Sequence, residues 1–291
     1  MGKEVYIEIE IKVNKEIVGI LGNFLIEQGC GGFVLDEEEQ GQSVELKVYH
    51  CNLAEAQALA GKVLKYLNSL KKMDLDVGQE RIKVKTVRKR DWQKFWKRDL
   101  KPIQIGEKIV VKPSWDKKDL PDKIVIKIDP KMAFGTGRHE TTKLCIKEIQ
   151  RLIQPDDRVL DVGTGSGILA VISAKLGASY VLAIDPDRIA IDSAQENIEK
   201  NEVKDIVEVK VGTINEKTPK GYFDLVVANL FKSKIIELFG KIKKTAKKSG
   251  VIILSGVLDS ERDEVSDFLK KRKTKIERIT QDGGWLCFVV K

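Results

Sequence analysis

The sequence predicts an α/β protein in which a doubly wound parallel sheet follows a smaller α+β domain. The chain has 291 residues, which is long for one average domain and suits two. An alternating strand and helix pattern of order βαββαβ occupies the first 88 residues. After residue 131, helical patterns alternate with continuous apolar runs, as in strands buried on both faces of a sheet.

The N-terminal pattern predicts a ferredoxin-like domain over residues 1–88. Apolar and polar residues alternate over 5–13 and 82–87, and apolar residues recur at helical spacing from Ile17 to Leu25. The order strand, helix, two strands, helix, strand is that of the split-βαβ plan. The expected elements are strands at 5–13, 32–35, 44–49 and 82–87, and helices at 17–25 and 53–70.

A charged segment over residues 89–100 separates this domain from the next. It carries Trp92, Phe95 and Trp96, and the two tryptophans would share one face of a short linking helix. We expect these aromatic side chains to dock the linker helix on a neighbouring core.

The second domain is expected over residues 101–291. Short strands are expected at 109–112 and 124–128, and a helix at 143–152. A doubly wound sheet with helices on both faces should follow, and two last strands around the turn at 282–284 predict a terminal antiparallel hairpin. The expected strands of this part are 159–162, 180–185, 206–211, 224–230, 250–256, 275–279 and 285–290.

Composition favours a cytoplasmic protein without a bound metal. Apolar residues make up 42% and charged residues 33% of the chain, and no apolar run approaches the roughly 18 residues of a spanning helix. The start of the chain lacks the features of a signal peptide. The four cysteines are scattered singly, so neither a zinc site nor a disulfide framework is predicted.

The net charge of +8 leaves two interpretations open. It favours an anionic partner such as nucleic acid or a ribonucleoprotein. A composition rich in Lys, Glu and Ile also fits heat adaptation, which requires no anionic partner.

A glycine-rich turn follows the strand that ends near Asp161. Gly163, Gly165 and Gly167 can adopt positive φ, and without a Cβ they allow a ligand to lie against the backbone. The third glycine comes two residues after the second, unlike the G-x-G-x-x-G of dinucleotide binders. Together with the acidic Asp161, this compressed turn favours a nucleoside that carries a sulfonium, namely S-adenosylmethionine.

Two further strand ends carry polar side chains. Asp185 follows at close to the interval of about 20 residues at which an acidic side chain grips ribose hydroxyls. Asn229 ends the run 224–230, where its amide can accept a hydrogen bond from an amine and orient the lone pair toward a methyl carbon. Alternatively, Asn229 caps the following helix.

A loop over residues 129–142 alternates glycines and hydroxyls with an aromatic residue, which suits a cover for a bound nucleoside. Thr141 or Thr142 could instead be the N-cap of the following helix. His139 is either a catalytic base or an imidazole that hydrogen-bonds a backbone carbonyl.

At these residues the whole chain resembles the methyltransferase family of ribosomal large-subunit protein L-eleven (PrmA type). The resemblance is carried by DPKMAFGTGRHETT, LDVGTGSGILAVISAKLGA, residues 185–201, VVANL and the weaker segment VKPSW. It implies a Rossmann-like class I methyltransferase domain, with contacts to S-adenosylmethionine at Thr142, Gly163, Asp185 and Asn229 and an active site lined by Phe134, Gly135, Thr136 and His139.

The resemblance also implies an activity and a partner. Members of the family methylate lysine ε-amines and the N-terminal α-amine of their target, held by the N-terminal domain. We therefore expect a protein N-methyltransferase acting on L-eleven, free or near the ribosome, with Asn229 and His139 as catalytic residues. The cofactor contacts expected are Phe134, Gly135, Thr136, Thr142, Asp161, Gly163, Gly165, Asp185 and Asn229.

The chain departs from the family at three places, with Thr164 for Cys, Glu140 for Pro and a bulkier segment 231–233 after Asn229. Three alternatives remain: an RNA or DNA N-methyltransferase, which the basic charge favours, a methyltransferase of another protein lysine, and a non-catalytic nucleotide sensor. The strand end at Leu230 and Phe231 lacks the Pro-Pro-aromatic platform expected for a flipped base.

Overall fold

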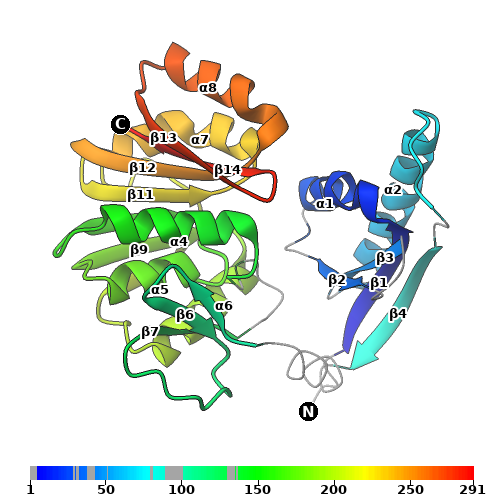
Figure 1. Ribbon diagram of the computed structural model, residues 1–291, viewed down its shortest axis with the longest axis horizontal. Helices are drawn as coiled ribbons and strands as arrows, with labels where there is room; N and C mark the ends of the chain where they lie inside the picture. The colour runs from blue at the N-terminus through cyan, green and yellow to red at the C-terminus, as the bar shows by residue number, and fades with distance from the viewer. Residues whose placement is uncertain are drawn as a thin grey trace. The chain divides into compact units, whose positions relative to one another are not determined.

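The computed structural model describes residues 5–28, 30, 33–37, 43–50, 52–78, 81–88, 101–129, 135 and 137–291. The chain divides into two compact units, Met1–Leu100 and Lys101–Lys291, and each is described by itself. Figure 1 shows the elements of both units in chain order.

The first unit contains one antiparallel sheet with the strand order β2-β3-β1-β4. The alternation of the sequence explains why one face of β1 is apolar, since Ile7, Ile9 and Ile11 are buried there against the helices. This is the element order and pairing of the split-βαβ plan. The elements are β1 (Val5–Asn14), the 3-10 turn η1 (Lys15–Ile17), α1 (Val18–Glu27), β2 (Val34–Glu37), β3 (Ser43–His50), α2 (Leu53–Lys71) and β4 (Arg81–Arg88).

The predicted linker helix over 89–100, with Trp92 and Trp96, lies outside the described residues. The second unit begins with a small sheet of order β5-β6-β7, formed by β5 (Ile103–Ile105), β6 (Ile109–Lys112) and β7 (Ile124–Lys127). The strand at β5 was not predicted because it is only three residues long. It is paired antiparallel to β6, while β7 runs parallel to β6.

A seven-stranded sheet of order β10-β9-β8-β11-β12-β14-β13 forms the centre of the second unit, which confirms the doubly wound fold predicted from the buried apolar runs. Five neighbouring strands are parallel, and β14 is antiparallel to both β12 and β13, which confirms the terminal hairpin. The strands are β8 (Arg158–Val162), β9 (Tyr180–Asp185), β10 (Val207–Val211), β11 (Phe223–Asn229), β12 (Ala246–Leu258), β13 (Ile276–Asp282) and β14 (Trp285–Val290).

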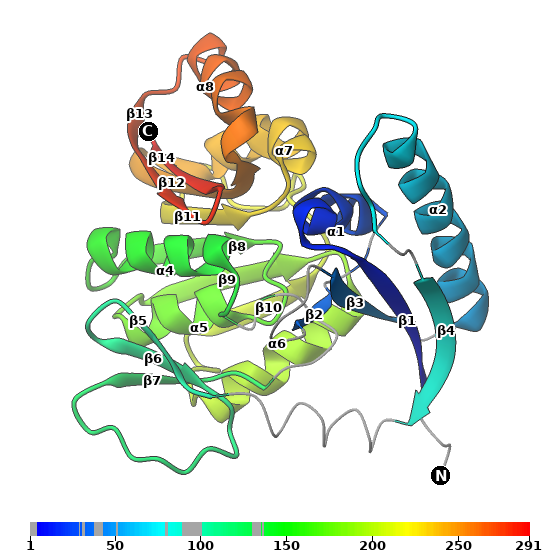
Figure 2. The same ribbon diagram turned by 45° about the vertical axis from the view of Figure 1, so that its right-hand side comes forward.

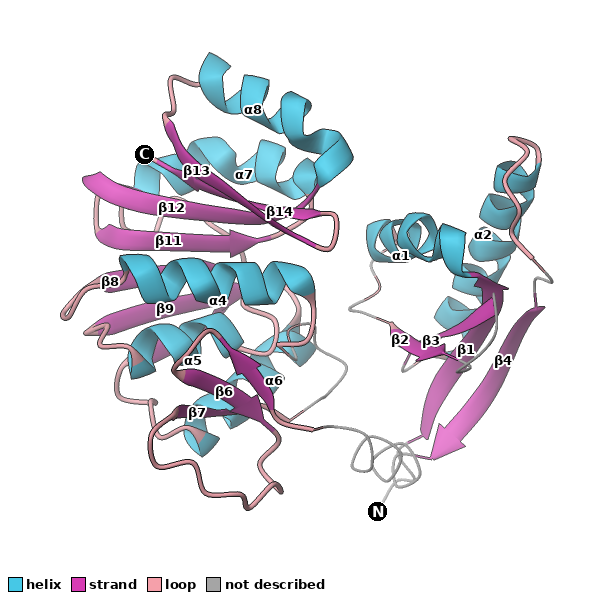
Figure 3. Ribbon diagram, viewed as in Figure 1, coloured by secondary structure: helices cyan, strands magenta, loops and turns pink. Residues whose placement is uncertain are grey.

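Helices cover both faces of this sheet (Figure 3). One face packs against α4 (Glu140–Leu152), α5 (Ile168–Lys175) and α6 (Arg188–Lys200), and the other against α7 (Lys232–Thr245) and α8 (Arg262–Lys271), which follows the short η2 (Asp259–Glu261). Figure 2 shows α4 and α5 beside the sheet, with α7 and α8 across it. Successive residues of β8, Val159 and Leu160, belong to the two different cores, because side chains alternate along a strand.

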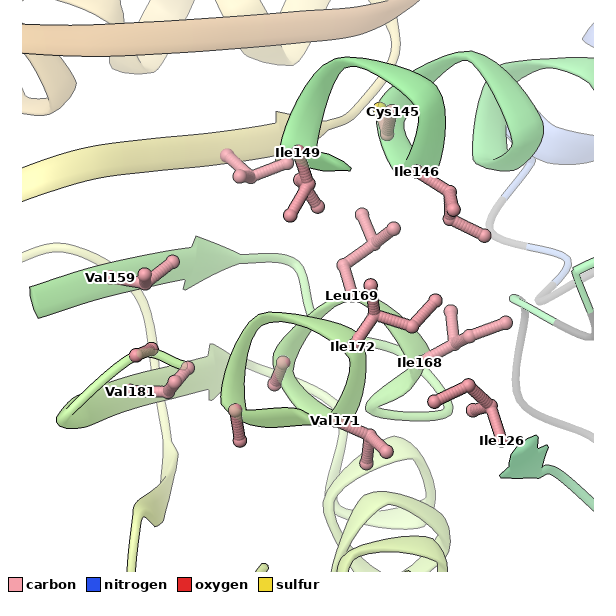
Figure 4. Close-up of a cluster of buried hydrophobic side chains, with 14 of the residues drawn as sticks. Ile126, Cys145, Ile146, Ile149, Val159, Ile168, Leu169, Val171, Ile172 and Val181 are labelled. Atoms are coloured by element: carbon pink, nitrogen blue, oxygen red, sulfur yellow. The ribbon is translucent and has the colours of Figure 1, made fainter. Parts of the chain in front are cut away.

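The glycine-turn helix α5 is surrounded by protein on every side, since each residue from Ile168 to Ala174 is buried. Its apolar side chains lie between α4, β8 and β9 (Figure 4). A helix held on all sides has little freedom to shift, so its first turn is a rigid support for whatever binds there.

The strand order reverses at β8, whose neighbours are β9 on one side and β11 on the other. In open α/β sheets, ligands bind beyond the carboxyl ends of the strands at such a reversal. The architecture therefore places a site where β8, β9 and β11 end, at Val162, Asp185 and Asn229.

Candidate active site

The glycine turn between β8 and α5 adopts the backbone conformation expected from its sequence. Gly163, Gly165 and Gly167 have φ values of 74°, 55° and 80°, a region that side chains other than glycine disfavour. A Cβ on Gly163 would lie 2.4 Å from Leu230 Cδ2, and one on Gly167 would lie 3.1 Å from the backbone of Ala194. The turn is thus packed tightly against the end of β11 and against α6.

Asp161 lies in β8 just before this turn and is fully buried. Its Oδ2 accepts a hydrogen bond of 2.6 Å from Thr164 Oγ1, while Oδ1 has no hydrogen-bond partner among the described residues. Burial, together with the charge of Asp185, raises the pKa of Asp161 to about 7. A nearby ligand cation would stabilise the ionised form, so this carboxyl fits the sulfonium and amino group of S-adenosylmethionine.

Asp185 ends β9 and is joined to the same turn. Its Oδ2 accepts a hydrogen bond from the backbone N–H of Gly165 at 2.9 Å, and its Oδ1 accepts one from Asp187 N–H at 2.9 Å. Burial raises the pKa of Asp185, and the two backbone donors oppose that effect. Each carboxylate oxygen has a further lone pair, so Asp185 can accept ribose hydroxyls while it holds the turn in place.

Asn229 ends β11 beside β8, and its side chain takes part in a short chain of hydrogen bonds. Asn229 Nδ2 donates to Thr141 Oγ1 at 3.2 Å, and Thr141 Oγ1 lies 2.9 Å from His139 Nδ1. Because His139 Nδ1 also accepts the backbone N–H of Thr141, it carries no proton, and the Thr141 hydroxyl donates its own proton to Nδ1. Asn229 therefore keeps its amide oxygen as the atom that can accept a hydrogen bond from an incoming amine.

The alternative roles considered for these polar residues are corrected by the structure. Asn229 does not cap the next helix, since Phe231 is the N-cap of α7. The N-cap of α4 is His139, so the prediction that Thr141 or Thr142 caps this helix was wrong. His139 Nδ1 accepts from Thr141 N–H at 3.3 Å, and its ring stands edge-on to Trp285 at 5.0 Å.

His139 is held as an oriented, neutral imidazole. Burial lowers the pKa of His139; the charge of Glu140 opposes this effect, and the charge of Lys143 adds to it. Since Nδ1 is the acceptor for both donors of Thr141, the ring proton belongs on Nε2. Thr141, which connects His139 with Asn229, was considered in the sequence only as a helix cap, and its role in this chain depends on the tertiary structure.

Thr142 is buried, and its Oγ1 has no hydrogen-bond partner among the residues that the structure describes. A buried hydroxyl without a partner costs free energy unless a ligand or water satisfies it. Thr142 Oγ1 and Asp161 Oδ1 are thus two polar atoms that a bound nucleoside would satisfy, which fits the expected cofactor.

The loop that precedes α4 reaches the glycine turn at Gly135, whose carbonyl oxygen accepts a hydrogen bond from Ser166 Oγ. A Cβ on Gly135 would lie 2.7 Å from the same Ser166 Oγ, so only glycine allows this approach. Phe134 and Thr136 lie outside the described residues. Glu140, one of the departures from the family, packs with its Cγ beside Gly283 of the terminal hairpin.

Asn197 is a buried residue of α6 that the sequence analysis did not select. Its Nδ2 donates to Ser166 O at 2.8 Å, and its Oδ1 accepts from Asp129 N–H at 3.3 Å, so it links the glycine turn to the start of the loop. A polar side chain on the buried face of α6, between Ala194 and Ile198, was the available signal. Among the described residues there is no cluster of metal-ligating side chains.

The fold and the site define a Rossmann-like class I methyltransferase: a doubly wound sheet, a compressed glycine turn and acidic residues at two successive strand ends. Comparison with known proteins identifies the family within this class of methyltransferases. The family model described as ribosomal protein L11 methyltransferase (PrmA) matches residues 5–291. The chain belongs to this family and is an S-adenosylmethionine-dependent methyltransferase.

Individual relatives agree with this assignment. A ribosomal protein L11 methyltransferase of Clostridium perfringens is 38% identical over 255 residues, which cover 87% of this chain and 81% of the relative. One from Listeria welshimeri is 34% identical, with 98% of each chain covered. The crystal structure of a ribosomal protein L11 methylase from Lactobacillus delbrueckii subsp. bulgaricus has a TM-score of 0.61 and 30% identity, covering 65% of this chain and 97% of that one.

The close packing of Gly163 predicts that Gly163→Ala weakens S-adenosylmethionine binding at least tenfold, measured by isothermal titration calorimetry. The added methyl group meets Leu230, strains a backbone at φ 74° and enters the surface on which the ligand would lie. Gly221→Ala is the matched control, because Gly221 also has positive φ but an added Cβ there would have nothing within 4 Å. Unchanged affinity in Gly163→Ala would refute the site.

The raised pKa of Asp161 predicts that S-adenosylmethionine binds more tightly as the pH rises through about 7. The ligand is cationic and prefers the ionised carboxylate, whose neighbours include the like-charged Asp185. The stability of the ligand-free fold depends on pH in the opposite direction. The raised pKa of Asp161 contributes stability that is fully present below the pKa of this carboxyl in the unfolded chain, and that is lost as the pH rises through about 7. Calorimetric titrations from pH 5.5 to 8.5 test the first expectation, and Asp161→Asn should flatten the profile.

Proposed function

We propose that this protein transfers methyl groups from S-adenosylmethionine to amines of ribosomal protein L11, namely lysine ε-amines and the N-terminal α-amine. The observation that carries the proposal is the hydrogen-bonded chain of Asn229, Thr141 and His139 beside the glycine turn. The curated relatives at 38% and 34% identity are named for the same target. We also propose that the reaction takes place in the cytoplasm; in the described residues no helix has the length and hydropathy to span a membrane.

The proposed cofactor contacts are those around the turn. The buried Asp161 Oδ1 faces the cationic end of the ligand, Asp185 accepts the ribose hydroxyls, and Thr142 Oγ1 gains a partner. Gly163 and Gly165 have no side chain to keep the ligand from the backbone. Gly135 is joined to the turn by the hydrogen bond from Ser166 Oγ to its carbonyl oxygen. Phe134 and Thr136 remain proposed contacts by the family resemblance alone.

S-adenosylmethionine, when bound, supplies a methyl group that the sulfonium charge activates. The acceptor must arrive as a neutral amine, although a lysine has an ordinary pKa of about 10.4. A site that removes the amine from water and places it near a positive charge lowers its pKa.

The chain's own residues then serve to align the amine. Asn229 Oδ1 accepts one N–H of the amine and directs its lone pair, and Thr141 prevents the amide from turning by accepting from Nδ2. His139 is proposed as a catalytic residue that lines the acceptor side with Nε2–H, rather than as a base through Nδ1, which Thr141 occupies. Alignment of this kind can lower the activation free energy of a reaction by about 7 to 11 kcal/mol.

We assign substrate holding to the N-terminal unit, residues 1–88, and propose residues 89–100 as the linker between it and the methyltransferase domain at 101–291. On the face of the four-stranded sheet that points away from its two helices, Glu8 and Glu10 are largely buried and both pair with the half-exposed Lys85. The assignment of substrate holding to this unit rests on the family resemblance.

Asn229→Ala should lower kcat about a hundredfold and raise the KM for S-adenosylmethionine much less, because the amide, although also a proposed cofactor contact, acts mainly on the amine. Thr141→Val should show a smaller loss in kcat, since the amide is then free to turn, and Thr141→Ser should restore it. Steady-state kinetics with unmethylated L11 measure these values. An Asn229→Ala variant that loses cofactor affinity and retains kcat would contradict the assigned role.

The target itself is tested by incubating the enzyme with labelled S-adenosylmethionine and a lysate, containing ribosomal proteins and nucleic acid, from cells lacking the methylation. Mass spectrometry should find label on L11 lysines and on its N-terminal amine. Label on RNA or DNA, or on lysines of other proteins in place of L11, would overturn the proposed target while leaving methyl transfer in place.

A further inference from the structure

One half of the amino edge of the central sheet, opposite the active site, carries a group of exposed cationic side chains, here called the basic edge. They come from the loop before β11, the end of α7 and the start of β12, and the end of α8 with the segment before β13. The basic edge comprises Lys220, Lys241, Lys244, Lys248, Lys270, Lys271, Arg272, Lys273 and Lys275, all exposed.

Backbone and side-chain contacts show that these segments are neighbours in space. Gly221 N–H donates to Lys244 O at 2.9 Å, which places the loop with Lys220 beside the end of α7. Lys243 Nζ donates to Arg272 O and Lys273 O, each at 3.0 Å, which joins the ends of α7 and α8. The basic edge is therefore one continuous strip.

Sheet topology places the strip away from the active site. The strands β11, β12 and β13 begin at Phe223, Ala246 and Ile276, next to the strip, whereas the site lies at the carboxyl ends of β8, β9 and β11. The helices α7 and α8 return antiparallel to these strands, so their last turns reach the same edge (Figure 1). A partner on the basic edge would leave the methyl-transfer site open.

The strip is local and is not a uniform lysine coating. The other half of the same edge has mixed charge, because the ends of α4 and α5 and the loops before β8 and β10 carry exposed Asp156, Glu202 and Asp205 together with Arg151, Lys175 and Lys204. Helix ends account for part of the strip, since Lys244, Lys270 and Lys271 follow the preference for cations at the last turn. Lys220, Lys248, Lys273 and Lys275 lie outside helices and have no such explanation.

Carboxylates neutralise little of this charge. Lys270 is 3.5 Å from Asp267 and Lys275 is 3.0 Å from Glu277. Within the described part of the chain, no carboxylate lies within ion-pair distance of Lys220, Lys244, Lys248 or Lys273. A row of unpaired cations raises the local potential and attracts a polyanion.

The chemistry of the strip identifies the polyanion. Lysine contacts phosphate as a point charge, and the exposed large apolar side chains of the described residues all lie elsewhere. A membrane surface would require apolar side chains that enter the interface, and base recognition would require aromatic platforms or amides. The partner that fits is a nucleic acid whose phosphate backbone is bound without regard to its base sequence.

We infer that the basic edge binds the phosphate backbone of RNA while the opposite edge of the sheet carries out methyl transfer. The choice of RNA rests on the proposed function, because a ribosomal protein substrate is found together with ribosomal RNA. Binding of this kind depends on salt and little on sequence. The enzyme then engages RNA and substrate protein from opposite edges of one domain.

The test is fluorescence anisotropy of the full-length protein with a labelled hairpin RNA. About four phosphate contacts lower the affinity roughly a hundredfold between about 50 and 200 mM salt. The variant Lys244→Glu/Lys248→Glu/Lys273→Glu should weaken binding at least tenfold at 100 mM salt. The matched control Lys108→Glu/Lys175→Glu/Lys204→Glu makes the same change of charge at exposed lysines outside the strip, and it should weaken binding less than threefold.

Equal weakening in the two triple variants, or no RNA binding by the wild-type protein at 50 mM salt, would overturn the inference. Anionic vesicles that bind more tightly than RNA, with loss in the basic-edge variant, would replace RNA by a membrane. Methylation of free L11 and affinity for S-adenosylmethionine should be unchanged in the basic-edge variant, which also shows that it is folded. Absence of L11 methylation by the wild-type protein, with RNA binding retained, would instead refute the proposed function alone.

Discussion

The carboxyl ends of β8, β9 and β11 meet where the strand order reverses, and every part of the candidate site depends on this meeting. The carboxylate of Asp185, at the end of β9, accepts a hydrogen bond from the backbone N–H of Gly165, in the turn that follows the neighbouring strand β8. On the other side, Gly163 lies so close to Leu230 that a methyl group would not fit without displacing it. The turn is therefore held from both neighbouring strands and from the fully buried helix α5 behind it.

This arrangement leaves polar atoms buried at a cost in free energy. Asp161 Oδ1 and Thr142 Oγ1 are inaccessible and without partners in the described structure, and such atoms destabilise a fold by about 1 to 3 kcal/mol each. A site that binds a polar ligand tolerates this cost because the ligand supplies the missing contacts. The same burial that raises the pKa of Asp161 makes the carboxyl responsive to a cation, so binding and protonation are coupled in one group.

The two edges of the central sheet have different chemistry. Its carboxyl edge carries a few buried polar groups with defined partners, while the half of its amino edge beside β11, β12 and β13 carries exposed lysines with few partners. Defined, desolvated hydrogen bonds suit chemistry on one amine, and exposed charges suit a long, uniformly charged partner. Because the length of the sheet separates the two edges, a partner bound at the amino edge does not block the site at the carboxyl edge.

The sequence by itself determined the order of elements, the buried strands and the residues at the glycine turn, because a period of two or 3.6 and the demand for glycine are local properties of the chain. The short β5 lacked enough residues to show a period, and the cap of α4 was misplaced because several polar residues at 139–142 compete for that position. Only the tertiary structure decided that Thr141 joins His139 to Asn229, and that Asn197 ties the glycine turn to Asp129. Apart from His139 and Thr141, these partners are at least 31 residues apart in the chain, and nothing in local spacing specifies which side chains a reversal of strand order will bring together.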